Sequence, residues 1–213
     1  MNLLTSEQAL FISERSEINR GNCVPRPRIH DQSNILDAVE RVIARDGVLT
    51  LGAVAKEAGV SKATVLYEHT SKRDLLAALV ARTIEADNAF NASCEAQFAG
   101  ELDAPLLGRI EATKRMQWVS GGNAAVLGLI SALMQDEALR GEFRANQEKL
   151  RAGLIEAAAD ARTTRLAWLA LEGFKFQQHM DLVAWSEAER AEILDDITTL
   201  ARTGTLIGEN SSD

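Results

Sequence analysis

Residues 35–80, ILDAVERVIARDGVLTLGAVAKEAGVSKATVLYEHTSKRDLLAALV, contain the pattern that decides the fold. The first apolar residues of this stretch recur at the spacing of one helical face. They are Ile35, Leu36, Val39, Val42 and Ile43. We therefore expect a helix from about Gln32 to Asp46, which Asn34 caps and which Gly47 ends in the left-handed conformation.

Capping residues divide the rest of this stretch into shorter elements. Thr50 is placed to cap a short helix that ends before Gly59, where the chain turns. Ser61 is placed to cap a second short helix, which reaches residue 67 or 69. Ser71 then opens a long helix, with Asp74 three residues later in a capping-box arrangement. Further helices are expected over residues 71–98, 104–119, 123–135, 137–160, 162–184 and 187–203.

Composition favours an all-α protein of ordinary hydrophobicity. The 213 residues include only three prolines and 5% aromatic residues, whereas no alternating strand pattern persists. No stretch approaches the roughly 18 apolar residues needed to cross a membrane, and no secretory signal is evident. The two cysteines suggest neither a metal site nor a disulfide framework, so we expect a reducing cytoplasm and no cofactor.

Charge separates the beginning of the chain from the rest. Residues 1–80 hold ten basic and ten acidic residues, so the net charge of −8 lies entirely in residues 81–213. An acidic total counts against binding to nucleic acid, but here it counts only against the carboxy-terminal part. Residues 15–28 carry four arginines and one acid, which indicates either a solvated terminus or a basic arm that follows a phosphate backbone.

The two short helices and the glycine turn between them form a helix-turn-helix pattern. On the second short helix, a rotation of 100° per residue gathers small and polar side chains on one face. This face holds Ala63, Thr64, Tyr67 and Glu68, whereas the opposite face holds Val65, Leu66 and His69. A helix that enters the major groove needs such a face next to the bases and a packed face behind it.

Residues 35–80 resemble the DNA-binding domain of tetracycline-repressor-like (TetR) bacterial transcriptional regulators. The resemblance is carried above all by Ala58-Gly59-Val60-Ser61-Lys62, by Tyr67 and by Ser71-Lys72. It also includes Ile35-Leu36-Asp37-Ala38, Gly47, Thr50, Val54-Ala55, Thr64 and Leu75-Leu76. The sequence departs from the family at His69 and Thr70, where Phe and Pro are usual, and at Ala63, where Gly is common.

The resemblance and the chemistry of the side chains predict a DNA-contacting set. Hydroxyl and ammonium groups suit phosphate oxygens, whereas small side chains and a carboxylate suit base edges. The predicted set is Thr50, Ser61, Lys62, Ala63, Thr64, Tyr67, Glu68 and Lys72. We expect His69 to be a core residue, and Glu68 to lie at the rim of the contact.

The resemblance also implies a domain order and a set of partners. Residues 1–30 are expected to form a basic extension, residues 31–77 the DNA-binding domain, and residues 78–213 a helical domain for dimerisation and effector binding. The expected partners are a double-stranded inverted-repeat operator, a second copy of the chain and a small molecule of unknown identity. The expected function is that of a ligand-responsive repressor.

Two sets of residues are proposed for the helical domain. The dimer interface is expected on the last two helices, which carry apolar stripes. It comprises Leu166, Leu169, Ala170, Gly173, Ile193, Leu194, Ile197 and Leu200. Large or soft side chains with a few polar ones form the candidate effector pocket, for which core packing is the competing interpretation. These residues are Phe90, Met116, Trp118, Met134, Phe143, Gln147, Trp168, Phe176, Gln177 and Met180.

Two other functions were weighed. A ferritin-like di-iron enzyme needs Glu-x-x-His, but Pro27, Leu66 and Phe176 stand three residues before the three histidines. No other catalytic or phosphate-binding motif occurs, so we expect no catalytic and no metal site. A dimerising adaptor without specific DNA binding is the remaining alternative, which the departures at His69 and Thr70 leave open.

Overall fold

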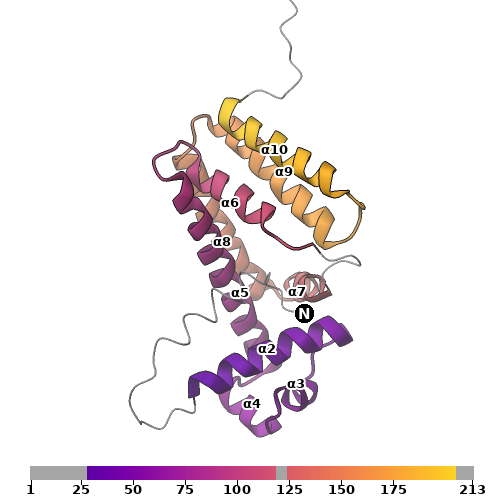
Figure 1. Ribbon diagram of the computed structural model, residues 1–213. Coiled ribbons are helices and arrows are strands. Elements are labelled where there is room, and N and C mark those ends of the chain that lie inside the picture. Colours follow the sequence, from indigo (N-terminus) through magenta and orange to yellow (C-terminus); the bar gives the residue numbers. More distant parts are fainter. Residues whose placement is uncertain (1–27, 119–123, 205–213) are drawn as a thin grey trace, which may run out of the picture. The chain divides into compact units, whose positions relative to one another are not determined.

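A computed structural model describes residues 28–118 and 124–204, in which all regular elements are helices (Figure 1). The all-α fold class is thereby confirmed. Most of the predicted basic extension lies outside the described residues. The elements are α2 (Arg28–Asp46), α3 (Leu51–Ala58), α4 (Lys62–Glu68), α5 (Lys72–Glu95), the 3-10 helix η1 (Ala96–Phe98), α6 (Ala104–Lys114), α7 (Ala124–Gln135), α8 (Glu137–Glu156), α9 (Ala161–His179) and α10 (Glu187–Thr203).

The chain forms two compact units, and each unit is built from two segments. The first comprises residues 1–86 and 123–143, and the second comprises residues 87–122 and 144–213. Helices α5 and α8 each begin in the first unit and end in the second. Helix α7 therefore groups with the helix-turn-helix, although the prediction assigned all residues after 77 to a single domain.

The first unit is organised around the apolar face of α2. All five residues of the predicted stripe are buried, together with Val54 of α3, Val65 of α4 and Leu75 and Leu79 of α5. Helix α7 packs against α2 so closely that a Cβ atom at Gly128 would collide with the side chain of Ile43. Burial of this apolar surface is the main driving force that holds the short helices in place.

The ends of the short helices follow the predicted caps. The Thr50 hydroxyl accepts a hydrogen bond from Ala53 N, and Ser61 Oγ accepts one from Thr64 N. Gly47 and Gly59 have φ values of 66° and 68°, in the left-handed region that glycine adopts without a steric cost. The predicted cap at Asn34 is wrong. Helix α2 begins earlier, so Asn34 lies inside it and its Nδ2 donates to Ala58 O at 2.9 Å.

The start of α5 shows half of the predicted capping box. Ser71 Oγ accepts a hydrogen bond from Asp74 N at 3.0 Å. The Asp74 carboxylate accepts from the backbone N–H of Thr70, at 2.8 Å, and not from that of Ser71. The proline that is usual in the family at this position has no N–H to donate. The hydrogen bond from Thr70 N–H to Asp74 therefore uses a donor that the usual proline would lack.

The second unit has a core built from α6, α8, α9 and α10. It includes Leu107 and Ile110 of α6, Leu154 of α8, Leu171 of α9 and Leu194 of α10. The buried carboxylate of Asp103 joins the loop before α6 to the loop before α9 and to the first turn of α9. Asp103 Oδ2 accepts from Ala159 N at 2.9 Å, and Asp103 Oδ1 accepts from the Thr164 hydroxyl at 2.5 Å.

Four of the predicted helix ends lie several residues too far along the chain. Helix α5 ends at Glu95, α6 at Lys114, α8 at Glu156 and α9 at His179. Asp160 begins α9 by accepting from Arg162 N at 2.8 Å, so α8 has to end before it. Asp181 has a φ of 50°, which stops α9. The predictions for α7 and α10 agree with the structure to within one residue.

Candidate nucleic-acid interface and ligand site

Of the four residues of α4 predicted to face the bases, Ala63 and Tyr67 are exposed, whereas Thr64 and Glu68 are half-buried. Lys62, Ala63 and Tyr67 are exposed, and Tyr67 has 72% of its surface free, whereas Val65 is fully buried. Leu66 was expected on the packed face, but 38% of its surface is exposed. Within α4 only Val65 is fully buried, and His69, which directly follows the helix, is the other buried side chain that anchors it.

Hydroxyl groups cluster where α4 begins. Ser61 Oγ lies 2.9 Å from Thr64 Oγ1, within hydrogen-bonding distance, and it also caps the helix. The Thr50 hydroxyl is similarly engaged by Ala53 N. These three predicted DNA contacts therefore have structural roles of their own, and each retains lone pairs or a proton for a phosphate oxygen.

The basic residues of the first unit fall into two groups. The Glu57 carboxylate accepts hydrogen bonds from Arg41 and Arg45, each at 2.8 Å. These bonds lower the pKa of Glu57, and the bond from Arg41 has the larger effect. Lys62 and Lys72 are exposed and have no acidic partner within 4.0 Å among the described residues. The ammonium groups of Lys62 and Lys72 lie at the beginnings of α4 and α5, where phosphate binding was predicted. A third exposed lysine without an acidic partner among the described residues, Lys56, lies in the last turn of α3.

His69 occupies the core position that was expected for it. Only 3% of its surface is exposed, and its backbone N–H donates to Val65 O at 2.8 Å. The ring Nε2 is buried and has no hydrogen-bond partner among the described residues. His69 thus fills the usual place of a phenylalanine while leaving one polar atom unsatisfied.

Two exposed apolar side chains of the first unit are not where the sequence analysis would place apolar residues. Val48, in the turn before α3, has 62% of its surface exposed, and Leu66 is the second. Leu66 was expected on the packed face of its helix, and no prediction was made for Val48. A count of charge or of hydroxyl groups does not detect them, and only the observed burial does.

Helix α9 has apolar residues on both of its faces. Ala167, Leu171 and Phe174 are buried in the core of the second unit. Four residues of the predicted interface, Leu166, Leu169, Ala170 and Gly173, are instead exposed, and 55% of the Leu169 surface is free. Phe176 continues this exposed stripe.

The predicted interface residues of α10 are placed differently. Leu194 and Ile197 are buried within the second unit, so the expectation that they lie on an outer face is wrong. Ile193 and Leu200 are half-buried against the same core. The error arises because the side of α10 that packs on α6 and α9 is as apolar as an interface would be.

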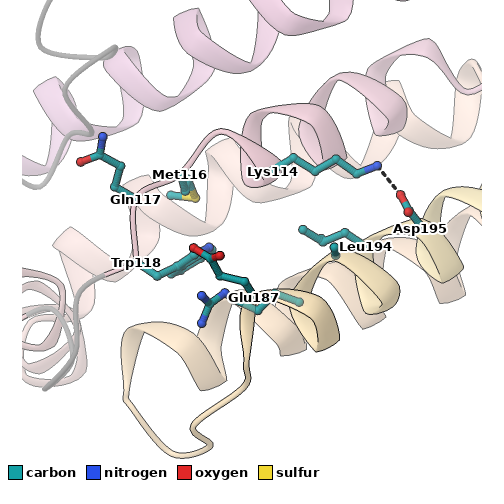
Figure 2. A pocket seen from close by; sticks show the side chains of 9 residues that line it. Lys114, Met116, Gln117, Trp118, Glu187, Leu194 and Asp195 are labelled. Carbon is teal, nitrogen blue, oxygen red and sulfur yellow. Dashed lines mark hydrogen bonds and ion pairs between the residues drawn. The ribbon is translucent and has the colours of Figure 1, made fainter.

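A hollow of about 560 Å³ opens between the end of α6 and the first half of α10 (Figure 2). The Lys114–Asp195 ion pair, at 2.6 Å, lies at one end, and Trp118 and Glu187 lie at the other. Met116 and Trp118 are the only predicted pocket residues in its lining. The lining residues are Lys114, Met116, Gln117, Trp118, Glu187, Arg190, Ala191, Leu194 and Asp195.

The other predicted pocket residues are divided between the two units. Phe143 packs in a cluster of the first unit, and Met134 is exposed there. The remaining six belong to the second unit. There Phe90 is buried, Phe176 is exposed, and Gln147, Trp168, Gln177 and Met180 are half-buried.

Trp118, which lines this hollow, also contacts a histidine of the second unit. The Trp118 ring lies 5.2 Å from that of His179 and meets Phe174 edge-on at 5.9 Å. Burial, followed by the positive charge of Lys175, lowers the pKa of His179 to about 4. The imidazole is consequently neutral at physiological pH and behaves as part of an aromatic cluster.

Two further searches cover the described residues only. No cluster of three or more His, Cys, Asp or Glu side chains in residues 28–118 and 124–204 could hold a metal ion. Within the same ranges, no helix has the length and hydrophobicity that crossing a membrane requires.

Two family models match the sequence, and together they cover 142 of its 213 residues. Residues 35–79 match "Bacterial regulatory proteins, tetR family", and residues 106–202 match "Tetracyclin repressor-like, C-terminal domain". The chain belongs to the tetR family. This membership confirms that it is a DNA-binding transcriptional regulator and not an enzyme.

Solved structures of tetR-family proteins share this fold. A member of the family from Streptomyces coelicolor A3, SCO1917, is 22% identical with a TM-score of 0.62, covering 82% of this chain and 99% of its own. The regulator LfrR from Mycobacterium smegmatis, in complex with proflavine, is 24% identical with a TM-score of 0.52. The match covers 83% of this chain and 97% of LfrR. The multidrug-binding protein EbrR, complexed with malachite green, is 24% identical with a TM-score of 0.62. The match covers 82% of this chain and 99% of EbrR. No curated protein matches the sequence.

Proposed function

We propose that this tetR-family regulator is a cytoplasmic repressor that binds an inverted-repeat operator as a homodimer and responds to a small molecule. The observation that carries the proposal is the exposed face of α4. Tyr67 and Ala63 are free on this face, and the unpaired ammonium groups of Lys62 and Lys72 accompany them. Such a face suits base edges, and its cations and hydroxyls suit the phosphates on either side.

The exposed apolar residues near α4 extend this surface. Leu66 and Val48 would lie against sugars or thymine methyl groups, where an apolar contact is favourable. Thr50, Ser61, Thr64 and Lys72 would fix the register through phosphate oxygens. Glu68, which is half-buried, would lie at the rim of this contact.

The second copy of the chain would pack on the exposed stripe of α9. Leu166, Leu169 and Phe176 supply apolar area there, and Ala170 and Gly173 let two helices approach closely. Space is open beside Gly173, since a Cβ atom at that position would meet no heavy atom within 4 Å. A two-fold axis along this stripe would present the two recognition helices to the half-sites of an inverted repeat.

A small molecule bound by the second unit would shift the population of the dimer away from the DNA-binding state. LfrR binds proflavine and EbrR binds malachite green, which makes an aromatic ligand a reasonable starting point for a search. The ligand has to bind the non-DNA state better than the DNA-binding state. Coupling of roughly 1–3 kcal/mol is typical of such regulators.

The test is a titration of the full chain against a duplex from upstream of its own gene, with a scrambled duplex as control, at two salt concentrations. We expect a preference for the native duplex and a steep loss of affinity at the higher salt concentration. Tyr67→Ala should weaken native binding by about tenfold, whereas Tyr67→Phe, which keeps the ring, should weaken it less.

Three results would count against this function. The first is equally weak binding to the native duplex, the scrambled duplex and a pool of random duplexes, which would favour a dimerising adaptor. The second is unchanged operator affinity in Tyr67→Ala. The third is a loss of the dimer in that variant, which would mean that Tyr67 acts through the fold rather than on DNA.

A further inference from the structure

The hollow between α6 and α10 is open to solvent and large enough for a small molecule. Its volume of about 560 Å³ lies within the range of ligand sites. All of its lining residues belong to the second unit. Those that are exposed are Lys114, Gln117, Glu187, Ala191 and Asp195. A ligand can therefore reach this space directly from solvent.

The charges of the lining cancel, but only half of them are paired. Lys114 Nζ lies 2.6 Å from Asp195 Oδ1, so these two groups satisfy each other. Glu187 has no cation within 4.0 Å among the residues that the structure describes. Arg190 donates from Nη1 to Trp185 O at 2.6 Å and has no described carboxylate within 4.0 Å. One uncompensated anion and one uncompensated cation thus border the hollow.

The spacing of these two groups selects for a ligand with both charges. Glu187 and Arg190 are three residues apart on α10, so they are neighbours on one face of the helix. A ligand with only an ammonium group would bring it close to the Arg190 guanidinium as well. A ligand with only a carboxylate would meet the Glu187 carboxylate in the same way. A zwitterion with its two charges close together offers each side chain an opposite charge.

The wall beside Glu187 suits an aromatic body. Trp118 and Glu187 lie at the same end of the hollow (Figure 2). The Trp118 ring is held from behind by Phe174, at 5.9 Å, and by His179, at 5.2 Å. Met116 adds a polarizable thioether to the lining. An aromatic ring stacked on Trp118 would therefore carry its charged groups toward Glu187.

The lining also includes the part of the chain that leads out of the second unit. Met116, Gln117 and Trp118 follow α6 closely, and the chain continues from them to α7. Helix α7 groups with the first unit and packs on α2. A ligand held by these residues would restrain the covalent connection to the DNA-binding unit.

We infer that this hollow is the effector site and that it takes a zwitterion with an aromatic body, such as an aromatic α-amino acid. The ammonium group binds Glu187, the carboxylate binds Arg190 and the ring stacks on Trp118. This inference rests on the proposed function, because it names the site and the ligand class of the same regulator.

Three probes that share a naphthalene ring and differ in charge test this class. They are 3-(1-naphthyl)-L-alanine, 2-(1-naphthyl)ethylammonium and 3-(1-naphthyl)propionate. We would titrate each into the full chain and follow binding by calorimetry. The zwitterion should bind about threefold to fivefold more tightly than either singly charged probe, which is the effect of one solvent-exposed ion pair.

Two variants should change which probe is preferred. In Glu187→Gln the zwitterion should bind no more tightly than the propionate, and in Arg190→Gln no more tightly than the ethylammonium. Damage to the fold would instead weaken all three probes alike. Glu192→Gln and Arg202→Gln change exposed residues of α10 outside the lining, so both should keep the preference for the zwitterion. Should Arg190→Gln fail to fold, Glu187→Gln alone decides.

The inference is overturned if a singly charged probe binds best, if Glu187→Gln keeps the preference for the zwitterion, or if no probe binds at millimolar concentration. Operator binding is measured on the same samples, and a saturating amount of the zwitterion should lower it by at least about fivefold. Absence of operator binding in the unaltered chain would refute the proposed function. Operator binding that the saturating zwitterion leaves unchanged would refute only the present inference.

Discussion

The two compact units differ in the kind of surface that they expose. In the first unit, apolar side chains are buried around α2 and the groups suited to DNA are exposed on α4. In the second, Leu169 and Phe176 belong to an apolar stripe of α9 that is exposed. Such a stripe on the surface of a folded unit is typical of a site of association.

The largest expected effect tests the exposed stripe of the second unit. Leu169→Glu should convert the dimer to monomers, because a carboxylate buried without a partner in an apolar interface is strongly unfavourable. Operator affinity should fall by roughly 100-fold once the two half-sites are bound independently. Analytical ultracentrifugation and an operator titration measure the two results. Leu102→Glu, at an exposed leucine outside α9, is the control. A dimer of unchanged mass in Leu169→Glu would place the interface elsewhere.

The next effect concerns the buried polar groups of the same unit. His179 has a pKa of about 4 in the folded chain and an ordinary value of 6.5. Between these two values the unfolded chain binds the proton and the folded chain does not, so stability falls as the pH falls from 6.5 to 4. The loss amounts to about 3 kcal/mol at most. Chemical denaturation at several pH values should show this slope, and His179→Gln should flatten it. Equal slopes in the two proteins would show that His179 titrates normally.

The smallest effect concerns the exception in the first unit. Replacing His69 with Phe removes the buried Nε2 that lacks a partner and restores the residue usual in the family. We expect the free energy of unfolding to rise by about 1 kcal/mol, with operator affinity unchanged within about twofold. Denaturant titration and operator binding measure both quantities. A less stable His69→Phe variant would mean that the ring site has no room for phenylalanine and that water satisfies the nitrogen.

The sequence by itself determined most of the helix-turn-helix part of the first unit, but not that α7 belongs to the same unit. The stripe on α2, the caps at Thr50 and Ser61 and the turns at Gly47 and Gly59 depend on residues only a few positions apart, and helical periodicity and capping chemistry are local. The family resemblance then indicated the function. Local rules failed at Asn34, whose amide bonds to Ala58, because α2 begins earlier than its nearest capping signal suggested.

Only the tertiary structure decided which apolar residues of the second unit are covered. Leu169 and Leu194 are alike in the sequence, yet one is exposed and the other is buried, since coverage depends on helices that are far apart along the chain. Asp103, which joins the loop before α6 to the start of α9, and Arg109, which lies between α5 and α9, were missed for the same reason. Periodicity identifies a helical face, whereas burial and pairing depend on what that face meets after folding.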